Sequence, residues 1–151
     1  MVDIVDASTR SRMMRSIRSK DTKPEMLVRH MLHSAGYRYR LHDRRLPGTP
    51  DLVLPKYRAA IFVSGCFWHG HDCRFFRMPT TRPEFWSAKI ARNRANDVKA
   101  RQKLAAADWR FATVWECALR GRDSSAIAET GKQLADWIRS GKECCSLQGV
   151  W

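Results

Sequence analysis

Hydrophobic and polar residues are arranged along the chain in short blocks that predict alternating helices and strands. A Thr-x-x-Glu capping box at 22–25 predicts the start of a helix, and Gly36 is a residue type that commonly ends one. The letters YRYRL after Gly36 alternate in polarity like a strand. Two short apolar runs, at 51–54 and 59–63, predict a pair of buried strands joined by a turn.

The second half of the chain continues this pattern. A second capping box at 81–84 predicts a long helix to about Ala107, and a final amphipathic helix is expected over 124–139. Between them, 109–117 alternates like a strand whose one face carries Trp109, Phe111, Thr113, Trp115 and Cys117. This order of elements predicts a single α/β domain in which helices flank a central mixed β-sheet.

The chain is strongly basic, since its 151 residues include 28 Lys and Arg against 15 Asp and Glu, a formal net charge of +13. This balance favours a polyanionic partner, with nucleic acid first and an anionic membrane second, over a merely soluble basic surface. Residues 1–20 form a basic arm that also carries Met13, Met14 and Ile17. No apolar run approaches the roughly 18 residues of a membrane-spanning helix, and the N-terminus lacks an apolar signal core, so a cytoplasmic protein is expected.

Five cysteines in a reducing compartment indicate metal binding or catalysis before disulfides. The segment GCFWHGHDC at 65–73 crowds two cysteines and two histidines together, and these are ligands that zinc prefers. A further cysteine, at the end of strand 109–117, would lie beside this segment if that strand neighbours 59–63. The preferred zinc set is therefore Cys66, His71, Cys73 and Cys117. The residues alone leave open whether His69 or His71 is the ligand, and thiols without a metal are the alternative.

Two carboxylates are candidates for catalysis. Asp51 follows Pro50 at the mouth of a strand, a position where one large class of nucleases binds Mg²⁺. Pro-Asp after Gly-Thr is also typical of an ordinary turn, and the next strand, IFVSG, lacks the acidic-x-Lys triplet of that class. Glu25 is interpreted either as the third residue of its capping box or as a partner of metal-bound water.

A third carboxylate lies in the long helix. Its inward stripe, with a spacing of seven residues, consists of Ile90, Asp97 and Leu104. An inward acid needs a partner. Asp97 would pair with Arg94 or Arg101, or else would orient His69 as a general base.

Large aromatic residues accompany the candidate metal ligands. Phe67 and Trp68 lie between them, and Trp86 is one turn into the long helix. These rings would pack beneath their own loop, or would wedge between base pairs from a basic surface. Met14 and Ile17 of the arm would act likewise from the other groove.

Six runs resemble one known family in collinear order over residues 7–122: DTKPE, LPGTPDLVLPKYRAAIF, GCFWHGHDC, TRPEFWSAKI, N-x-x-N-D and VWECALRG. They resemble the very-short-patch (Vsr) DNA mismatch endonucleases. The resemblance implies a restriction-endonuclease-like core of modified PD-(D/E)xK type. It also implies nicking of one strand 5′ to the T of a T:G mismatch left by deamination of 5-methylcytosine.

The same resemblance implies an organisation into a DNA-contacting arm at 1–20, an endonuclease domain at 21–140 and a C-terminal tail at 141–151. The expected partner is double-stranded DNA with a T:G mismatch, in a bacterial cytoplasm and associated with the nucleoid. A monomer is expected, because an asymmetric mismatch does not demand two-fold symmetry.

The resemblance also implies roles for individual residues. Asp51 becomes the direct Mg²⁺ ligand, together with the backbone carbonyl of Val63. His69 becomes the general base, supported by Asp97, and Glu25 a partner of metal-bound water.

The remaining implied roles concern zinc and DNA. The structural Zn²⁺ site consists of Cys66, His71, Cys73 and Cys117. The major-groove wedge consists of Phe67, Trp68 and Trp86, with Met14 near the opened step on the minor-groove side.

The chain departs from the family pattern at two adjacent positions. Val63 stands where Thr is usual, which a backbone ligand tolerates, and Ser64 stands where His is usual. We expect activity to survive, lowered or with altered metal dependence. Two alternatives are a nuclease of the same fold with another DNA target, and a zinc-stabilised DNA-binding module that has lost catalysis. The aromatic wedge disfavours the first alternative, and the Val63-Ser64 departure favours the second.

Overall fold

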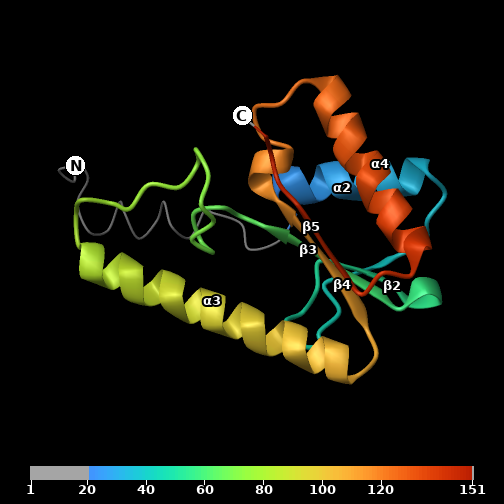
Figure 1. Ribbon diagram of the computed structural model, residues 1–151, viewed down its shortest axis with the longest axis horizontal. Coiled ribbons are helices and arrows are strands. Elements are labelled where there is room, and N and C mark those ends of the chain that lie inside the picture. The colour runs from blue at the N-terminus through green and yellow to red at the C-terminus, as the bar shows by residue number, and fades with distance from the viewer. Residues whose placement is uncertain (1–20, 151) are drawn as a thin grey trace.

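A five-stranded sheet forms the centre of the molecule in the computed structural model, which describes residues 21–150 (Figure 1). The strands lie side by side in chain order, β1 (Arg40–Leu41), β2 (Leu52–Leu54), β3 (Ala59–Ser64), β4 (Arg110–Trp115) and β5 (Cys144–Leu147). The first three pair antiparallel and the last three parallel, so the predicted mixed sheet is confirmed. The predicted arm at 1–20, with Met14, lies outside the described residues.

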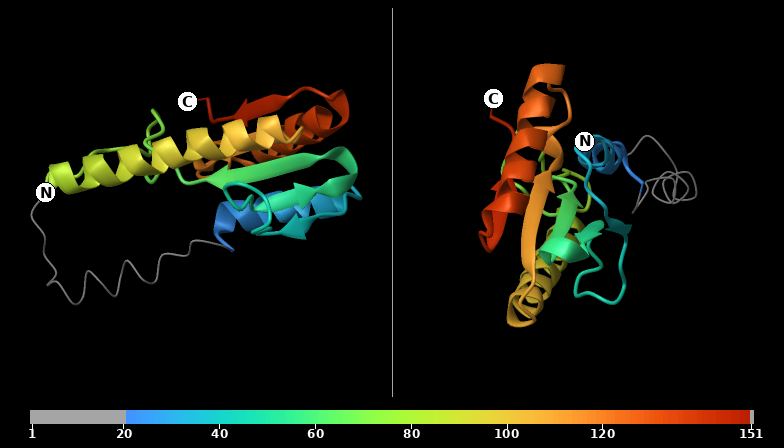
Figure 2. Two further views of the ribbon diagram at one scale, coloured as in Figure 1. Left: turned by 90° about the horizontal axis from the view of Figure 1, so that it is seen from below. Right: turned by 90° about the vertical axis from the view of Figure 1, so that its right-hand side faces the viewer.

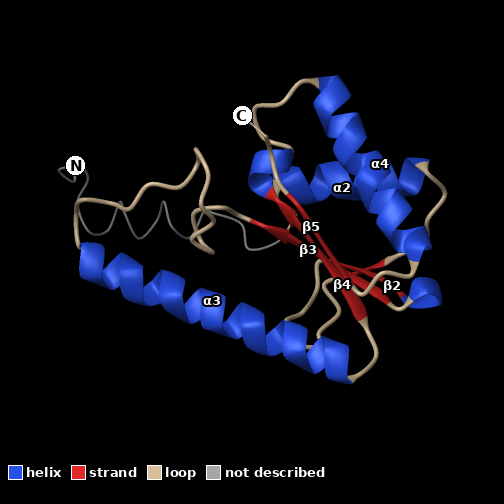
Figure 3. Cartoon of the chain, viewed as in Figure 1, coloured by secondary structure: helices blue, strands red, loops and turns tan. Residues whose placement is uncertain are grey.

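Three helices cover the two faces of this sheet (Figures 1 and 3). α2 (Lys23–Ser34) and α4 (Ser124–Ser140) pack together on one face, and α3 (Pro83–Ala106) lies on the other. Short 3₁₀ turns follow two strands, η1 (Pro55–Tyr57) after β2 and η2 (Glu116–Ala118) after β4. Among the described helices, none is long and apolar enough to cross a membrane.

β3 is apolar up to its last residue, Ser64, because it contributes to a core on each face of the sheet. Ala59 and Ile61 belong to the larger core beneath α2 and α4. Ala60 and Phe62 point the other way and pack against Leu104 of α3. β3 is therefore held on both sides, and the loop that leaves it starts from a fixed point.

The first predicted helix start is confirmed, and the second is wrong by one residue. Oγ1 of Thr22 accepts the N–H of Glu25 at 3.3 Å, so α2 begins as predicted. α3 instead begins at Pro83, after Arg82 in the left-handed conformation, which makes no side-chain capping bond. Proline suits the first helical position, since its fixed φ matches the helix and its missing N–H is not needed there.

The predicted last strand is shorter than expected, and another strand follows it. β4 ends at Trp115, and Cys117 lies in η2 rather than on a strand. The segment 144–147 was not expected to be regular, but it pairs with β4 as β5 at the sheet edge. Its four residues, CCSL, are too few to carry a strand signal of their own, and pairing with β4 fixes their conformation.

The loop between β3 and α3 and the first turns of α3 extend away from the sheet (Figures 1 and 2). Only Ile90, Ala100 and Leu104 are buried along α3. This projecting region carries the Cys/His segment and the large rings.

Candidate active site and metal centre

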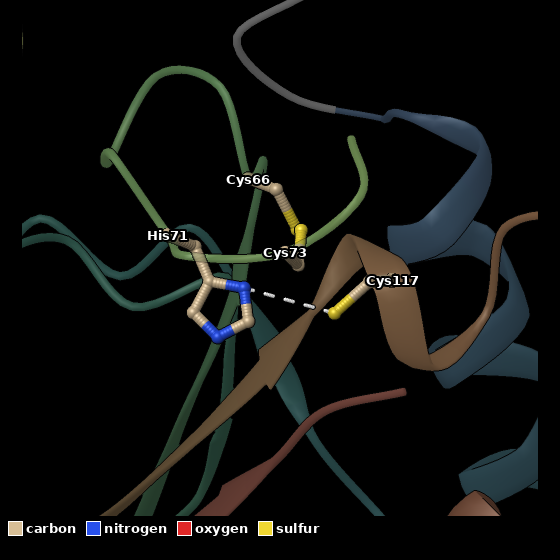
Figure 4. A group of neighbouring side chains, drawn as sticks. All are labelled: Cys66, His71, Cys73 and Cys117. Carbon is tan, nitrogen blue, oxygen red and sulfur yellow. Dashed lines mark hydrogen bonds between the residues drawn. The ribbon is translucent and has the colours of Figure 1, made fainter. Parts of the chain in front are cut away.

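The four predicted zinc ligands converge on one point (Figure 4). Cys66, His71 and Cys73 come from the loop after β3, and Cys117 comes from η2. One ligand atom from each residue lies within 4.8 Å of all the others. Sγ of Cys117 is 3.7 Å from Nδ1 of His71. Tetrahedral bonds of about 2.3 Å to sulfur and about 2.0–2.1 Å to nitrogen would separate these atoms by about 3.6 Å, so the four residues fit zinc.

Local turns and the parallel ladder bring these ligands together. The loop folds back on itself where the N–H of His71 donates to the carbonyl of Cys66 at 2.9 Å. Gly70 turns the chain there with φ +61, a conformation that suits glycine. Because Ser64 pairs with Trp115, the ends of β3 and β4 coincide and Cys117 falls beside the loop.

Burial raises the pKa of the thiols of Cys66 and Cys117. Zinc binds thiolate, so a divalent cation at this point would supply the charge stabilisation that burial removes. Two buried thiols and an imidazole that face one another form a donor set suited to zinc rather than to magnesium.

His69 points away from this cluster and toward α3. Its Nδ1 lies 2.5 Å from Oδ2 of Asp97. Asp97 also has the expected alternative partner, since Nη1 of Arg101 is 3.8 Å from Oδ1 and Nη2 donates to Thr113 at 2.7 Å. Because a carboxylate can only accept a hydrogen bond, Nδ1 of His69 carries the proton and donates that bond to Asp97. This leaves Nε2 of His69 as the basic nitrogen.

Asp51 lies directly before β2 and is largely buried. Its Oδ2 accepts the N–H of Val63 at 2.7 Å. Burial raises the pKa of Asp51 to about 7, the hydrogen bond from Val63 opposes this shift, and the charge of neighbouring Glu25 adds to it. A buried carboxylate beside a second carboxylate suits a hard divalent cation. The positive charge of the cation would offset the cost of burying the Asp51 carboxylate and its repulsion by Glu25.

The Val63 carbonyl lies on the same side of β3 as Asp51. In an extended strand, the N–H and C=O of one residue point toward the same neighbouring strand. The register Leu52↔Ile61, if continued, would set Pro50 opposite Val63, and proline has no N–H to donate. Pro50 therefore gives no ladder hydrogen bond to this carbonyl, which fits the ligand role that the resemblance implies.

Glu25 is 1% exposed and surrounded by donors. Its Oε2 accepts from the guanidinium of Arg29, from the N–H of Asp21 at 3.1 Å and from Nε2 of His42 at 2.9 Å. The capping box is thus only half formed, because the Glu25 carboxylate binds Asp21 instead of the N–H of Thr22.

His42 was not among the predicted site residues. Besides its bond to Glu25, its Nε2 is 4.0 Å from Oδ1 of Asp51, so one imidazole faces both carboxylates. Its backbone has φ +45, and its N–H donates to the carbonyl of Asp51 at 3.1 Å. Asp21, Glu25 and His42 also offer ligand atoms within 4.8 Å of one another. No sequence motif marks His42, since its position depends on the β1–β2 turn.

The three predicted wedge rings form one cluster on the projecting region. Phe67 lies 5.1 Å from Trp68 and 5.5 Å from Trp86 between ring centroids, and the two tryptophans are 5.8 Å apart. Phe85, which was not predicted, packs on Trp86 at 5.1 Å and is 43% exposed. The rings therefore pack against one another in edge-to-face and tilted arrangements, while the cluster stays partly open to solvent.

A cavity of about 650 Å³ lies between two rings of this cluster, the candidate base His69 and the end of β3. It is lined by the end of β3, by two of the rings and by the base candidate, namely Val63, Ser64, Phe67, Trp68 and His69. A single hollow thus contains both kinds of predicted residue.

Comparisons with known proteins agree with this arrangement. The family model described as DNA mismatch endonuclease Vsr matches residues 2–75. DNA mismatch endonuclease Vsr of Escherichia coli (strain K12) is 43% identical over 138 residues, which cover 91% of this chain and 88% of that protein. Type II nicking enzyme V.XorIIP of Xanthomonas oryzae pv. oryzae is 51% identical over 119 residues, 79% of this chain and 88% of that protein. Type II nicking enzyme V.NmeAIP of Neisseria meningitidis serogroup A is 43% identical over 122 residues, 81% and 87% of the two chains.

The fold and these matches define an endonuclease that has a restriction-endonuclease-like core and belongs to a class of nucleases that use divalent metal ions. The chain belongs to the Vsr family of DNA mismatch endonucleases.

Proposed function

We propose that this protein is a Mg²⁺-dependent monomer that nicks one strand of double-stranded DNA 5′ to the T of a T:G mismatch arising from 5-methylcytosine deamination. The observation that carries the proposal is the shared cavity, in which the rings of Phe67 and Trp68 lie beside His69 and the end of β3. Family membership supports the same activity, since relatives are named as mismatch endonucleases and nicking enzymes.

The carboxylate of Asp51 and the carbonyl of Val63 would hold the magnesium ion. The bound ion would neutralise charge on the scissile phosphate and lower the pKa of the attacking water. Asp51 is held in place by the N–H of Val63, so its free oxygen has a defined direction. Glu25, which is fixed by Arg29 and His42, would orient a water molecule in the site.

His69 would act as the general base. Asp97 holds its Nδ1, and the opposite nitrogen would take the proton of the attacking water. The negative charge of Asp97 would then stabilise the imidazolium. Arg101, anchored on Thr113, keeps the Asp97 carboxylate in position.

Phe67, Trp68 and Trp86 would enter the DNA stack beside the mismatch, where opening a weakly paired step costs least. A zinc ion at Cys66, His71, Cys73 and Cys117 would hold the loop that carries both the rings and His69. Detection of the mismatch and cutting would therefore share one rigid segment. The arm at 1–20, with Met14, would contact the opposite groove.

The decisive experiment is a single-turnover nicking assay with Mg²⁺ on two duplexes that differ only by T:G or C:G at one site. Asp51→Ala protein is the matched control. We expect a nick 5′ to the mismatched T, absent from the C:G duplex and from the variant reaction. Equal cutting of both duplexes would show that the protein is a nuclease of the same fold with another DNA target, and not a mismatch endonuclease. Binding without cutting, in Mg²⁺ or Mn²⁺, would favour a DNA-binding module that has lost catalysis.

A further inference from the structure

The chain that follows β5 contacts two of the four candidate zinc ligands. Oε1 of Gln148 lies 2.7 Å from Nε2 of His71, and the N–H of Gly149 donates to Sγ of Cys117 at 3.3 Å. Gln148 and Gly149 are consecutive, and they belong neither to the loop nor to the turn that supplies the ligands. We propose that they are positioning residues of the zinc centre, so that the segment after β5 closes it. This inference rests on the zinc site proposed above.

The sheet explains how this segment reaches the site. β5 runs parallel to β4, and Leu147 pairs with Val114, so both strands end at the same place. The chain after β5, red in Figure 4, therefore passes beside the turn that carries Cys117.

Trp115 links the same two parts of the molecule. Its ring stacks on His71 with centroids 4.1 Å apart and planes 10° from parallel. Its Nε1–H donates to Oγ of Ser146 at 3.2 Å. His71 is thus held on its face by Trp115 and at its edge by Gln148, and both holds depend on the alignment of β4 with β5.

Both contacts favour the form of the ligand that binds zinc. Nδ1 of His71 faces Cys117, so the proton of the neutral ring resides on Nε2 and is donated to the Gln148 carbonyl. A hydrogen bond of this kind fixes the tautomer and the direction of a metal-binding imidazole. The N–H of Gly149 stabilises negative charge on the Cys117 sulfur. Binding of zinc and docking of the segment after β5 should therefore strengthen each other.

The first test measures the zinc dissociation constant of the full chain by competition with a chromogenic chelator at constant pH. Gln148→Ala should raise this constant about tenfold, the lower end of the effect typical of second-layer partners. Gln133→Ala is the matched control, because Gln133 is an exposed glutamine of α4 away from the ligands. Gln133→Ala should bind zinc like the unaltered chain.

A second pair of variants tests the backbone donor. Gly149→Pro removes the N–H and should also weaken zinc binding, whereas Gly149→Ala keeps the N–H and should not. Nitrogen-edited NMR of the zinc-loaded chain should show the His71 proton on Nε2, and this preference should weaken in Gln148→Ala.

Unchanged zinc affinity in both Gln148→Ala and Gly149→Pro, with zinc bound by the unaltered chain, would overturn this inference alone. A chain that binds no zinc before any substitution would overturn the zinc centre itself. The two failures are distinguished by the zinc content of the unaltered protein.

Discussion

The sharpest conflict between stability and function lies at one residue, Asp51. Its pKa is raised to about 7 by burial, against about 3.9 in an unfolded chain. Above pH 7 and without magnesium, the folded protein contains a buried, charged Asp51 carboxylate, which lowers the free energy of unfolding by up to about 4 kcal/mol. This loss diminishes as the pH falls from 7 toward 4 and the carboxylate takes up a proton. We therefore expect Asp51→Asn to be more stable than the unaltered chain at pH 8, and similar near pH 4.

Urea unfolding at both pH values, without added magnesium, measures this difference. Added Mg²⁺ should stabilise the unaltered chain and leave Asp51→Asn unchanged. A variant less stable at pH 8 would show that the hydrogen bond from Val63 requires a charged carboxylate. The same variant should not nick DNA.

His42 is a residue whose contribution only the structure reveals. It binds Glu25 and faces Asp51 from a left-handed backbone position. His42→Ala should slow nicking roughly tenfold, which corresponds to about 1.4 kcal/mol in the barrier. His42→Gln keeps an N–H donor and should retain most activity, while His33→Ala on the exposed side of α2 is the control. Equal rates for all three would assign His42 to packing alone.

Ser64 stands at the position where the resemblance to the family leads us to expect His. It is buried at the end of β3 and lines the cavity beside His69. A longer donor there would reach a phosphate or water, and a hydrogen bond contributes about 0.5–1.5 kcal/mol. Ser64→His should thus raise the single-turnover nicking rate between about twofold and tenfold at limiting Mg²⁺. An unchanged rate would show that the departure is neutral.

At the scale of elements, the sequence correctly predicted those helices and strands whose formation depends on neighbouring residues. The apolar run of β3 and the Thr22 cap of α2 were confirmed because burial and capping act within a few residues. β5 was missed because its order comes from β4, and the start of α3 was placed one residue early because Pro83 suits the first helical position. His42 was missed for the same kind of reason, since a hairpin carries it to Glu25.

The turn after β4 should depend on zinc. Cys117 is the candidate ligand that ties this turn to the loop after β3. Cys117→Ser should abolish stoichiometric zinc and lower the melting temperature markedly, because binding and folding are coupled at such sites. The exposed Cys144 gives the matched control, and Cys144→Ser should keep both properties. Full zinc content in Cys117→Ser, measured by metal analysis, would refute the ligand set.

At the scale of the whole molecule, a net charge of +13 and the projecting region act together. In the proposed function, the charge would draw the protein to any duplex, whereas the rings of Phe67, Trp68 and Trp86 would respond to the base stack. These two contributions respond differently to salt, since phosphate contacts release counterions and ring stacking does not.

We therefore expect binding to matched DNA to fall by about three decades between 50 and 200 mM salt, as for roughly six phosphate contacts. The preference for a T:G duplex over a C:G duplex should change little over that range. Fluorescence anisotropy titrations of both duplexes, with Trp68→Ala as the control for stacking, measure the two quantities separately. Trp68→Ala should keep the salt slope and lose most of the preference. If the slope is nearly flat, phosphate contacts do not dominate, and DNA is not the main partner of the basic surface.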